Sequence, residues 1–103
     1  MKIEKFEDIK AWQEARGLTK DQIRSAAASI MANIAEGFDS QSDVEFIKFL
    51  IYSRRSASEV QSHLYVALDQ EYLPEEHFKK LSEDIVKIKS LIYGFIRYLR
   101  KDK

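Results

Sequence analysis

The stretch FKKLSEDIVKIKSLIYGFIRYL, residues 78–99, decides the fold class of this chain. Its apolar residues recur at alternating spacings of three and four, the a/d seam of a helix that packs along its whole length. The seam consists of Phe78, Leu81, Ile85, Ile88, Ile92, Phe95 and Leu99. Pro74, followed by Glu75 and Glu76, is typical of a helix start. The pattern therefore predicts one long helix over about residues 74–100.

A second long helix is predicted just before it, ending near residue 71. Ser42 and Glu45 have the spacing of a capping box at its start. Its seam is Phe46, Leu50, Ser53, Ala57, Val60, Leu64 and Ala67. The small residues Ser53 and Ala57 in the middle predict that a neighbouring helix approaches closely there. Because the link through residues 72–73 is short, the two helices are expected to form an antiparallel hairpin.

The N-terminal third can be interpreted in two ways. A helical stripe of Ile23, Ala27, Ile30 and Ile34 ends at Gly37, a natural C′ position. Thr19 with Gln22 forms a capping box, and Leu18 with Ile23 forms a hydrophobic staple. Gly17 can then end a separate helix over residues 6–16, whose apolar residues are Phe6, Ile9 and Trp12.

The alternative is one continuous helix over residues 6–37, which would match the other two in length. The break is favoured, because the seam extended back from Ile23 meets Lys20, Arg16 and Gln13. The predicted fold is thus an all-α, antiparallel up-down four-helix bundle with a shortened first helix, in one domain over residues 1–103. The alternative fold has three long helices, and in it the subunits could exchange a helix.

Composition excludes several classes of function. The chain has no Cys, which excludes disulfides, thiolate catalysis and cysteine zinc sites, and its two histidines, His63 and His77, are too few for a histidine-rich metal site. No nucleophile–base set or glycine-rich phosphate loop is visible, so we expect neither enzymatic activity nor a cofactor. The charged N-terminus does not resemble a signal peptide, and no apolar run has the length of a membrane span. We expect a cytoplasmic protein.

The zero net charge, 17 basic against 17 acidic residues, conceals an asymmetry. Residues 1–41 carry a net charge of −1, residues 42–73 carry −2, and residues 74–103 carry +3. Repeated around an oligomer, the basic end of the last helix could attract phosphate backbones. The predicted nucleic-acid-binding residues are Arg54, Arg55, Lys89, Arg97, Arg100 and Lys101.

The stretch QIRSAAASIMANIAEGF, residues 22–38, is the most specific motif of the chain. It resembles the signature of the bacterial family of proteins encoded in 23S ribosomal RNA intervening sequences. The elements FED (6–8), AWQ (11–13), EFIKFL (45–50) and SASEV (56–60) agree with the same family. The chain departs from the family pattern after Arg16, where the end of the first helix and its loop are missing before Gly17, and at Arg55, where many members have glycine.

The resemblance implies a four-helix bundle that assembles into a homo-oligomeric ring, in particular a pentamer, without enzymatic activity. Its related proteins include the accessory proteins of diversity-generating retroelements, which partner a reverse transcriptase and bind nucleic acid. The signature positions Arg24, Asn33, Glu36 and Gly37 are expected to organise the corner after the signature helix.

A second apolar stripe beside the helix seams is expected to form the oligomer contact. Its members are Ile47, Ile51, Tyr65, Leu68, Tyr72, Tyr93 and Ile96. The sequence therefore predicts an oligomeric scaffold or accessory protein that binds nucleic acid, or a reverse-transcriptase-like partner, through a basic rim. The alternative is a structural or protein–protein interaction module that binds no nucleic acid.

Overall fold

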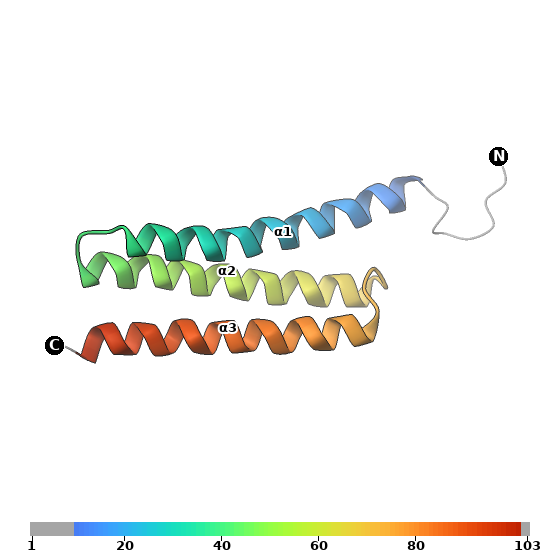
Figure 1. The fold of residues 1–103 in the computed structure, drawn as a ribbon. Coiled ribbons are helices and arrows are strands. Elements are labelled where there is room, and N and C mark those ends of the chain that lie inside the picture. Colours follow the sequence, from blue (N-terminus) through green and yellow to red (C-terminus); the bar gives the residue numbers. More distant parts are fainter. Residues whose placement is uncertain (1–9, 102–103) are drawn as a thin grey trace.

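The computed structural model describes residues 10–101, apart from the side chains of residues 11–13, 15–18 and 101, and this range contains three helices. They are α1 (Lys10–Phe38), α2 (Asp43–Asp69) and α3 (Glu75–Lys101), and each is antiparallel to the next (Figure 1). The all-α prediction is confirmed, and the alternative of three long helices fits. A four-helix bundle is not found within the described residues.

α1 is continuous through Gly17 and Thr19, so the predicted break there is wrong. A glycine inside a helix costs only about 1 kcal/mol, and a continuous helix keeps its backbone groups paired. Lys20, one of the polar seam positions that favoured a break, is exposed and needs no buried surface; the side chains of Arg16 and Gln13 lie outside the described residues. The predicted start at residue 6 and the side chains of Trp12 and Leu18 lie outside the described residues.

Gly37 brings the end of α1 close to the start of α2. It lies inside α1 and not at C′, because the helix continues to Phe38 and the φ of Gly37 is not positive. A Cβ atom added to Gly37 would lie 2.7 Å from Cδ1 of Phe46 and 3.1 Å from Cβ of Phe49. The glycine is therefore required for close packing and not for a left-handed backbone.

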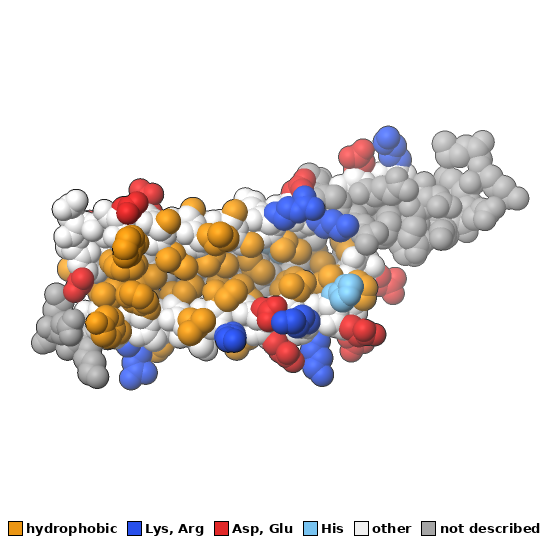
Figure 2. All heavy atoms as spheres, in the orientation of Figure 1, with side chains coloured by type: hydrophobic (Ala, Val, Ile, Leu, Met, Phe, Trp, Pro, Cys, Tyr) orange, Lys and Arg blue, Asp and Glu red, His pale blue; other side chains and the backbone are white. Residues whose placement is uncertain are grey.

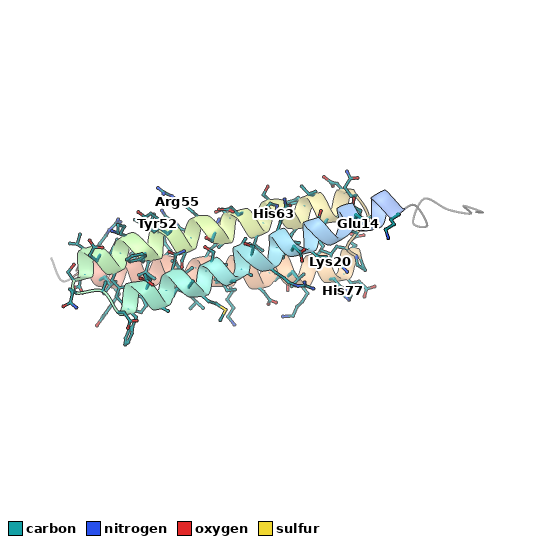
Figure 3. All side chains as sticks on the ribbon, turned by 90° about the horizontal axis from the view of Figure 1, so that it is seen from above. Glu14, Lys20, Tyr52, Arg55, His63 and His77 are labelled. Atoms are coloured by element: carbon teal, nitrogen blue, oxygen red, sulfur yellow. The ribbon has the colours of Figure 1, made fainter. Side chains whose placement is uncertain are left out.

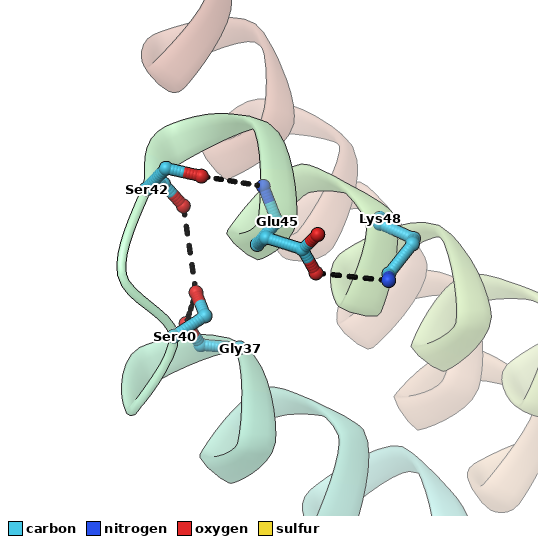
Figure 4. A network of polar contacts seen from close by, with 5 residues as sticks. All are labelled: Gly37, Ser40, Ser42, Glu45 and Lys48. Carbon is cyan, nitrogen blue, oxygen red and sulfur yellow. Dashed lines mark hydrogen bonds and ion pairs between the residues drawn. The ribbon is translucent and has the colours of Figure 1, made fainter.

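The loop between α1 and α2 is held by serine side chains (Figure 4). The hydroxyl of Ser40 donates to the carbonyl of Gly37. Ser42 is the N-cap of α2, and its Oγ accepts a hydrogen bond from the backbone N–H of Glu45 at 3.2 Å. The predicted cap is confirmed, and Lys48 pairs with the Glu45 carboxylate at 2.8 Å in the same turn.

α1 and α2 pack closely through small polar side chains. Ser53, fully buried on α2, donates to the backbone carbonyl of Ile30 at 2.6 Å. Ser56 donates to the hydroxyl of Ser29 at 3.0 Å, and Asn33 also donates to the Ser29 carbonyl at 2.9 Å. The predicted close approach at the small seam of α2 is confirmed, and the neighbour is α1.

α2 and α3 form the predicted hairpin, joined through residues 70–74. Glu71 adopts a left-handed backbone with φ 60°, which allows the N–H of Tyr72 to donate to the carbonyl of Ala67 at 2.8 Å. Such a 6→1 bond pairs a carbonyl that the end of a helix would otherwise leave open. α3 then packs on α2 through buried aliphatic residues, namely Ile85, Ile92, Ile96 and Leu99.

The three helices occupy three corners of a bundle and leave the fourth corner open. Within the described residues α1 and α3 each pack on α2 but not on each other. Figure 2 shows hydrophobic side chains in a band along the middle of this face, over all three helices. We call this face the open corner; its apolar lining is Met31, Ile34, Ala35 and Phe38 of α1, Phe46 of α2, and Phe95 of α3.

The open corner corrects part of the predicted core. Leu81 and Phe95 belong to the α3 seam, and fourteen residues, or two heptads, separate them on one face of the helix. Their side chains are nevertheless 41% and 44% exposed, whereas Ile85 and Ile92 of the same seam are buried. Two of the seven seam residues therefore stay partly exposed within the described part of one chain, although the ring of Phe95 lies 5.1 Å from that of Phe46.

Candidate nucleic-acid interface

Three of the predicted nucleic-acid-binding residues come together between α2 and α3. Arg54 of α2 and both Lys89 and Arg97 of α3 line one open hollow of about 460 Å³. We call it the basic groove; its other lining residues are Gln61, Val86, Ser90, Tyr93 and Gly94. No acidic side chain of the described residues is among them, so the groove combines cations with hydrogen-bonding and aromatic groups.

Helical spacing explains why these residues meet. Arg54 and Gln61 are seven residues apart, so both point from the same face of α2. Lys89, Tyr93 and Arg97 follow one another at intervals of four on α3. Arg97 lies two residues after Phe95, about 200° around the helix. The basic groove and the open corner therefore lie on different sides of α3.

The side chains of the groove are partly organised by one another. The ammonium group of Lys89 donates to Oε1 of Gln61 at 3.0 Å, a contact that joins the two helices. The guanidinium of Arg97 lies 6.0 Å from the ring centroid of Tyr93 on the preceding turn. A ring and a guanidinium held side by side can offer a stacking surface and a phosphate contact to one strand.

The ion pairs found among the described residues lie outside the groove. They are Arg24–Asp21, Lys48–Glu45 and Lys80–Asp84. Hydrogen bonds that the ammonium groups donate to Glu45 and Asp84 raise the pKa of Lys48 and of Lys80 above the ordinary lysine value. The cations of the groove have no such carboxylate within the described part of the chain, so their charge is available to an external anion.

The groove continues toward the end of α3. A second open hollow, of about 710 Å³, is lined by Gly94, Arg97, Tyr98 and Arg100. Gly94 and Arg97 belong to both hollows, and a Cβ atom on Gly94 would meet nothing within 4 Å. Lys101 continues the helix, but its side chain lies outside the described residues.

Arg55 does not belong to the groove, although it follows Arg54 directly. One residue turns a helix by about 100°, and this step places Arg55 on another side of α2. Its guanidinium lies 5.8 Å from the ring centroid of Tyr52, and Figure 3 shows both side chains at the edge of the molecule. The pair Arg54 and Arg55 is thus not one surface.

Two of the four signature residues, Asn33 and Gly37, make contacts that support the packing of α1 on α2. Asn33 bonds to Ser29 inside α1, Gly37 packs against Phe46, Glu36 is exposed, and Arg24 pairs with Asp21 at 3.3 Å on the surface. Gly37 lies next to the corner, but it packs against Phe46 and does not take the predicted C′ position. Asn33 instead supports the contact between α1 and α2, through the serine pair that its side chain joins.

The predicted oligomer stripe does not form one free surface. Ile96 is 1% exposed and belongs to the core, so it cannot offer a contact to a second chain. Ile47 and Ile51 are partly buried against that core, and Tyr72 and Leu68 are also partly buried. Tyr93 lines the basic groove, and Tyr65 packs edge-on against Phe78 with ring centroids 5.0 Å apart. The most exposed apolar residues, Met31 and Phe38, line the open corner and were not part of the predicted stripe.

Sequence reasoning missed Gln61 as a member of the groove. The seven-residue interval from Arg54 places Gln61 on the same face of α2. A polar residue between two apolar stripes does not by itself indicate a binding site, however. Only the contact with Lys89 across the helix pair marks it as part of the site.

Neither metal sites nor membrane spans are found in the part of the chain that the structure describes. No three side chains of His, Asp or Glu there come together as metal ligands. His63 and His77 lie on different helices, as Figure 3 shows. No described helix combines the length and the apolar character needed to cross a bilayer.

The fold defines a class: an all-α protein with three long antiparallel helices in its described residues. The family profile of the 23S rRNA-intervening sequence protein matches residues 9–94, and the chain belongs to this family. The resemblance of the signature stretch is thereby confirmed. No curated protein matches the chain.

One solved structure has a similar fold and sequence. It is a protein of unknown function from the S23 ribosomal protein family of Bacteroides thetaiotaomicron, with a TM-score of 0.74 and 29% sequence identity. The similarity covers 77% of this chain and 73% of that one. It supports the helical fold and the family, and it names no activity.

Proposed function

We propose that the protein is a non-enzymatic, homo-oligomeric helical scaffold that binds the backbone of a nucleic acid through the basic groove. The observation that carries the proposal is the convergence of Arg54, Lys89 and Arg97 on one hollow without a neighbouring acid. The net charge of zero does not oppose it, because binding depends on the local field and not on the sum over the chain.

Each group in the groove has a role in such binding. Arginine and lysine neutralise phosphates and release counterions, and Tyr93 offers its ring to a base of an unpaired strand. Gln61 keeps Lys89 directed toward the groove through the 3.0 Å bond. The cations that carry the proposal would contact phosphates, which every sequence presents alike, so we expect binding that depends on salt more than on sequence.

Repetition makes a small groove effective. Three or four cations on one chain bind a backbone weakly, but several copies on one assembly act on the same strand and raise its effective concentration. The ring of five chains that the family resemblance implies is one such arrangement. A reverse-transcriptase-like partner and a cytoplasmic location remain predictions of the resemblance.

The test is fluorescence anisotropy of a labelled single-stranded RNA of about 20 nucleotides, titrated with protein at several salt concentrations. The variant Arg54→Gln/Lys89→Gln/Arg97→Gln should bind at least about tenfold more weakly, and its dependence of log K on log salt should lose a slope of about 2–3. The matched control Arg24→Gln/Arg55→Gln/Lys80→Gln removes the same charge outside the groove and should bind like the natural chain. Equal binding by both variants would overturn the proposal.

The open corner favours a second candidate, a protein-interaction module without nucleic-acid binding. It would be supported if the natural chain does not retain RNA at about 50 mM salt, conditions under which electrostatic binding is strong. The same titration therefore decides between the two candidates.

A further inference from the structure

The side of α3 that carries the basic groove also carries a hollow of different charge. We call it the acidic hollow; it has a volume of about 510 Å³, and its lining residues are Leu68, Glu75, Phe78, Lys79, Ser82, Glu83 and Val86. Val86 lines both hollows, so they form one continuous surface along the hairpin. Val86 and Tyr93 are 53% and 51% exposed, and α1 packs on α2 but not on α3. No described helix therefore lies over this surface.

The residues of this surface are placed symmetrically about Val86. Glu75 and Arg97 each lie eleven residues from Val86, and Lys79 and Tyr93 each lie seven residues from it. Eleven residues make about three helical turns and seven make about two, so all five positions share one face of α3. An acid at one end and a base at the other thus lie at equal distances from the centre, and the face extends over about 33 Å.

Such a face is complementary to itself. When a second α3 is turned end for end about an axis through Val86, Glu75 of each copy faces the partner's Arg97. Lys79 then meets the ring of the partner's Tyr93, a favourable cation–π contact. A parallel arrangement in register would instead bring Glu75 to the partner's Glu75, and like charges repel each other. The order of the charges therefore selects a second copy in the antiparallel orientation.

We infer that a second copy of the chain covers this face, with the two α3 helices antiparallel about a twofold axis at Val86, and that nucleic acid competes with this copy for the basic groove. In the pair, Arg97 meets a carboxylate of the partner instead of a phosphate. The pairing rests on the face alone, whereas the competition rests on the proposed function. The protein then has a closed form, whose cations are covered, and an open form that binds RNA.

The pair is expected to be weak. Its contacts are exposed charges around one small apolar residue, so salt screens them strongly. Weak pairing suits a contact that RNA has to displace, and urea separates such a pair before the helices unfold. The oligomer of the proposed function binds RNA with this face uncovered, so its own contacts lie elsewhere.

Disulfide formation at position 86 tests the pair directly, because the chain has no native cysteine. The twofold axis brings the thiols of two Val86→Cys chains within reach of each other. The control is Leu91→Cys, at a position that is 65% exposed on another side of α3. With a mild oxidant at low salt, Val86→Cys should crosslink at least about tenfold faster than the control on a non-reducing gel, since pairing raises the effective concentration of its thiol.

An exchange of charges tests the register of the pair. Added to Val86→Cys, Glu75→Arg places a cation opposite the partner's Arg97 in both contacts, and crosslinking should slow at least about fivefold. Arg97→Glu as a third change restores opposite charges in reversed order, and the rate should return to within about twofold of that of Val86→Cys. Both charged positions are exposed, so these changes leave the core intact.

The oxidised Val86→Cys pair tests the competition. In the anisotropy titration of the proposed function, the reduced chain should bind the labelled RNA, and the oxidised pair should bind it at least about tenfold more weakly at the same salt concentration. The oxidised Leu91→Cys pair is the control. It is linked away from the groove and should keep the affinity of its reduced chain.

The outcomes separate the pair from the proposed function. Equal crosslinking at positions 86 and 91 overturns the pair, as does a slow rate that the third change does not restore. Equal RNA binding by the reduced chain and the oxidised Val86→Cys pair overturns the competition alone. If the reduced chain does not bind RNA while the crosslinking results hold, the proposed function fails and the pair stands.

Discussion

α2 packs against α1 and against α3 through different kinds of side chain. Toward α1 it presents the buried serines Ser53 and Ser56, and Phe46 and Phe49 lie so close that Gly37 has no space for a Cβ atom. Toward α3 it meets buried isoleucine and leucine side chains. The first interface depends on small volume and hydrogen bonds, and the second on apolar area. One helix can thus pack against two neighbours through different interactions. Substitutions at the two interfaces should therefore have different effects on stability.

The largest effect is expected at the apolar interface, from Ile96→Ala. Ile96 is 1% exposed, and removing its side chain loses transfer free energy and leaves a cavity, at a cost of about 2–5 kcal/mol. Urea unfolding at one fixed protein concentration measures it. Val86→Ala on the exposed side of α3 is the control and should change stability by less than about 0.5 kcal/mol. Equal losses in the two variants would contradict the division between core and surface.

The next prediction compares Gly37, which is crowded by α2, with Gly94, which faces open space. Gly37→Ala forces a Cβ atom to within 2.7 Å of Phe46, so α1 and α2 must separate, and we expect a loss of about 1–3 kcal/mol. Gly94→Ala meets nothing within 4 Å and should add about 1 kcal/mol through helix propensity alone. Thermal unfolding of both variants checks this difference in sign. Stabilisation by both would show that the close approach at Gly37 is easily relaxed.

A smaller effect is expected from Ser53→Ala. The variant keeps the small volume that α1 requires and removes only the 2.6 Å bond to the carbonyl of Ile30, which contributes about 1 kcal/mol. Urea unfolding against Ser58→Ala, an exposed serine of the same helix, isolates the buried bond. If the two serines behave alike, volume alone sets the interface between α1 and α2.

The sequence predicted the features that depend on local period and end signals. The seam of residues 78–99, the cap at Ser42 and the short link before α3 lie where expected. The small seam around Ser53 also has its close neighbour. The cap and the seam spacing suffice as signals because they concern residues within two turns of one another, where spacing fixes which side chains share a face. The small seam announces a close neighbour, but that neighbour comes from α1, 23 residues earlier at Ile30.

The sequence could not predict what depends on an absent neighbour. The spacing of the seam indicates which side of α3 is apolar. The exposure of Leu81 and Phe95 depends in addition on whether a fourth helix lies beside them. The capping signals at Thr19 likewise mark a possible start without forcing the chain to leave the helix. Of the candidate site, Arg97 and Arg100 lie close together as expected, while the separation of Arg54 from Arg55 follows from rotation about α2.

The smallest effect is expected outside both interfaces, at the ion pair of Lys80 and Asp84. Its 2.8 Å length is close to that of the Ser53 bond, yet the side chains are 71% and 46% exposed. Water competes for both groups, so Lys80→Gln should leave the unfolding midpoint within the error of measurement at neutral pH. The hydrogen bond to Asp84 raises the pKa of Lys80, so any contribution is present at neutral pH and is lost as the pH rises above about 10.5. A marked loss at pH 7 would mean that length, and not burial, governs the polar contacts of this bundle, and the distinction between its interfaces would need another basis.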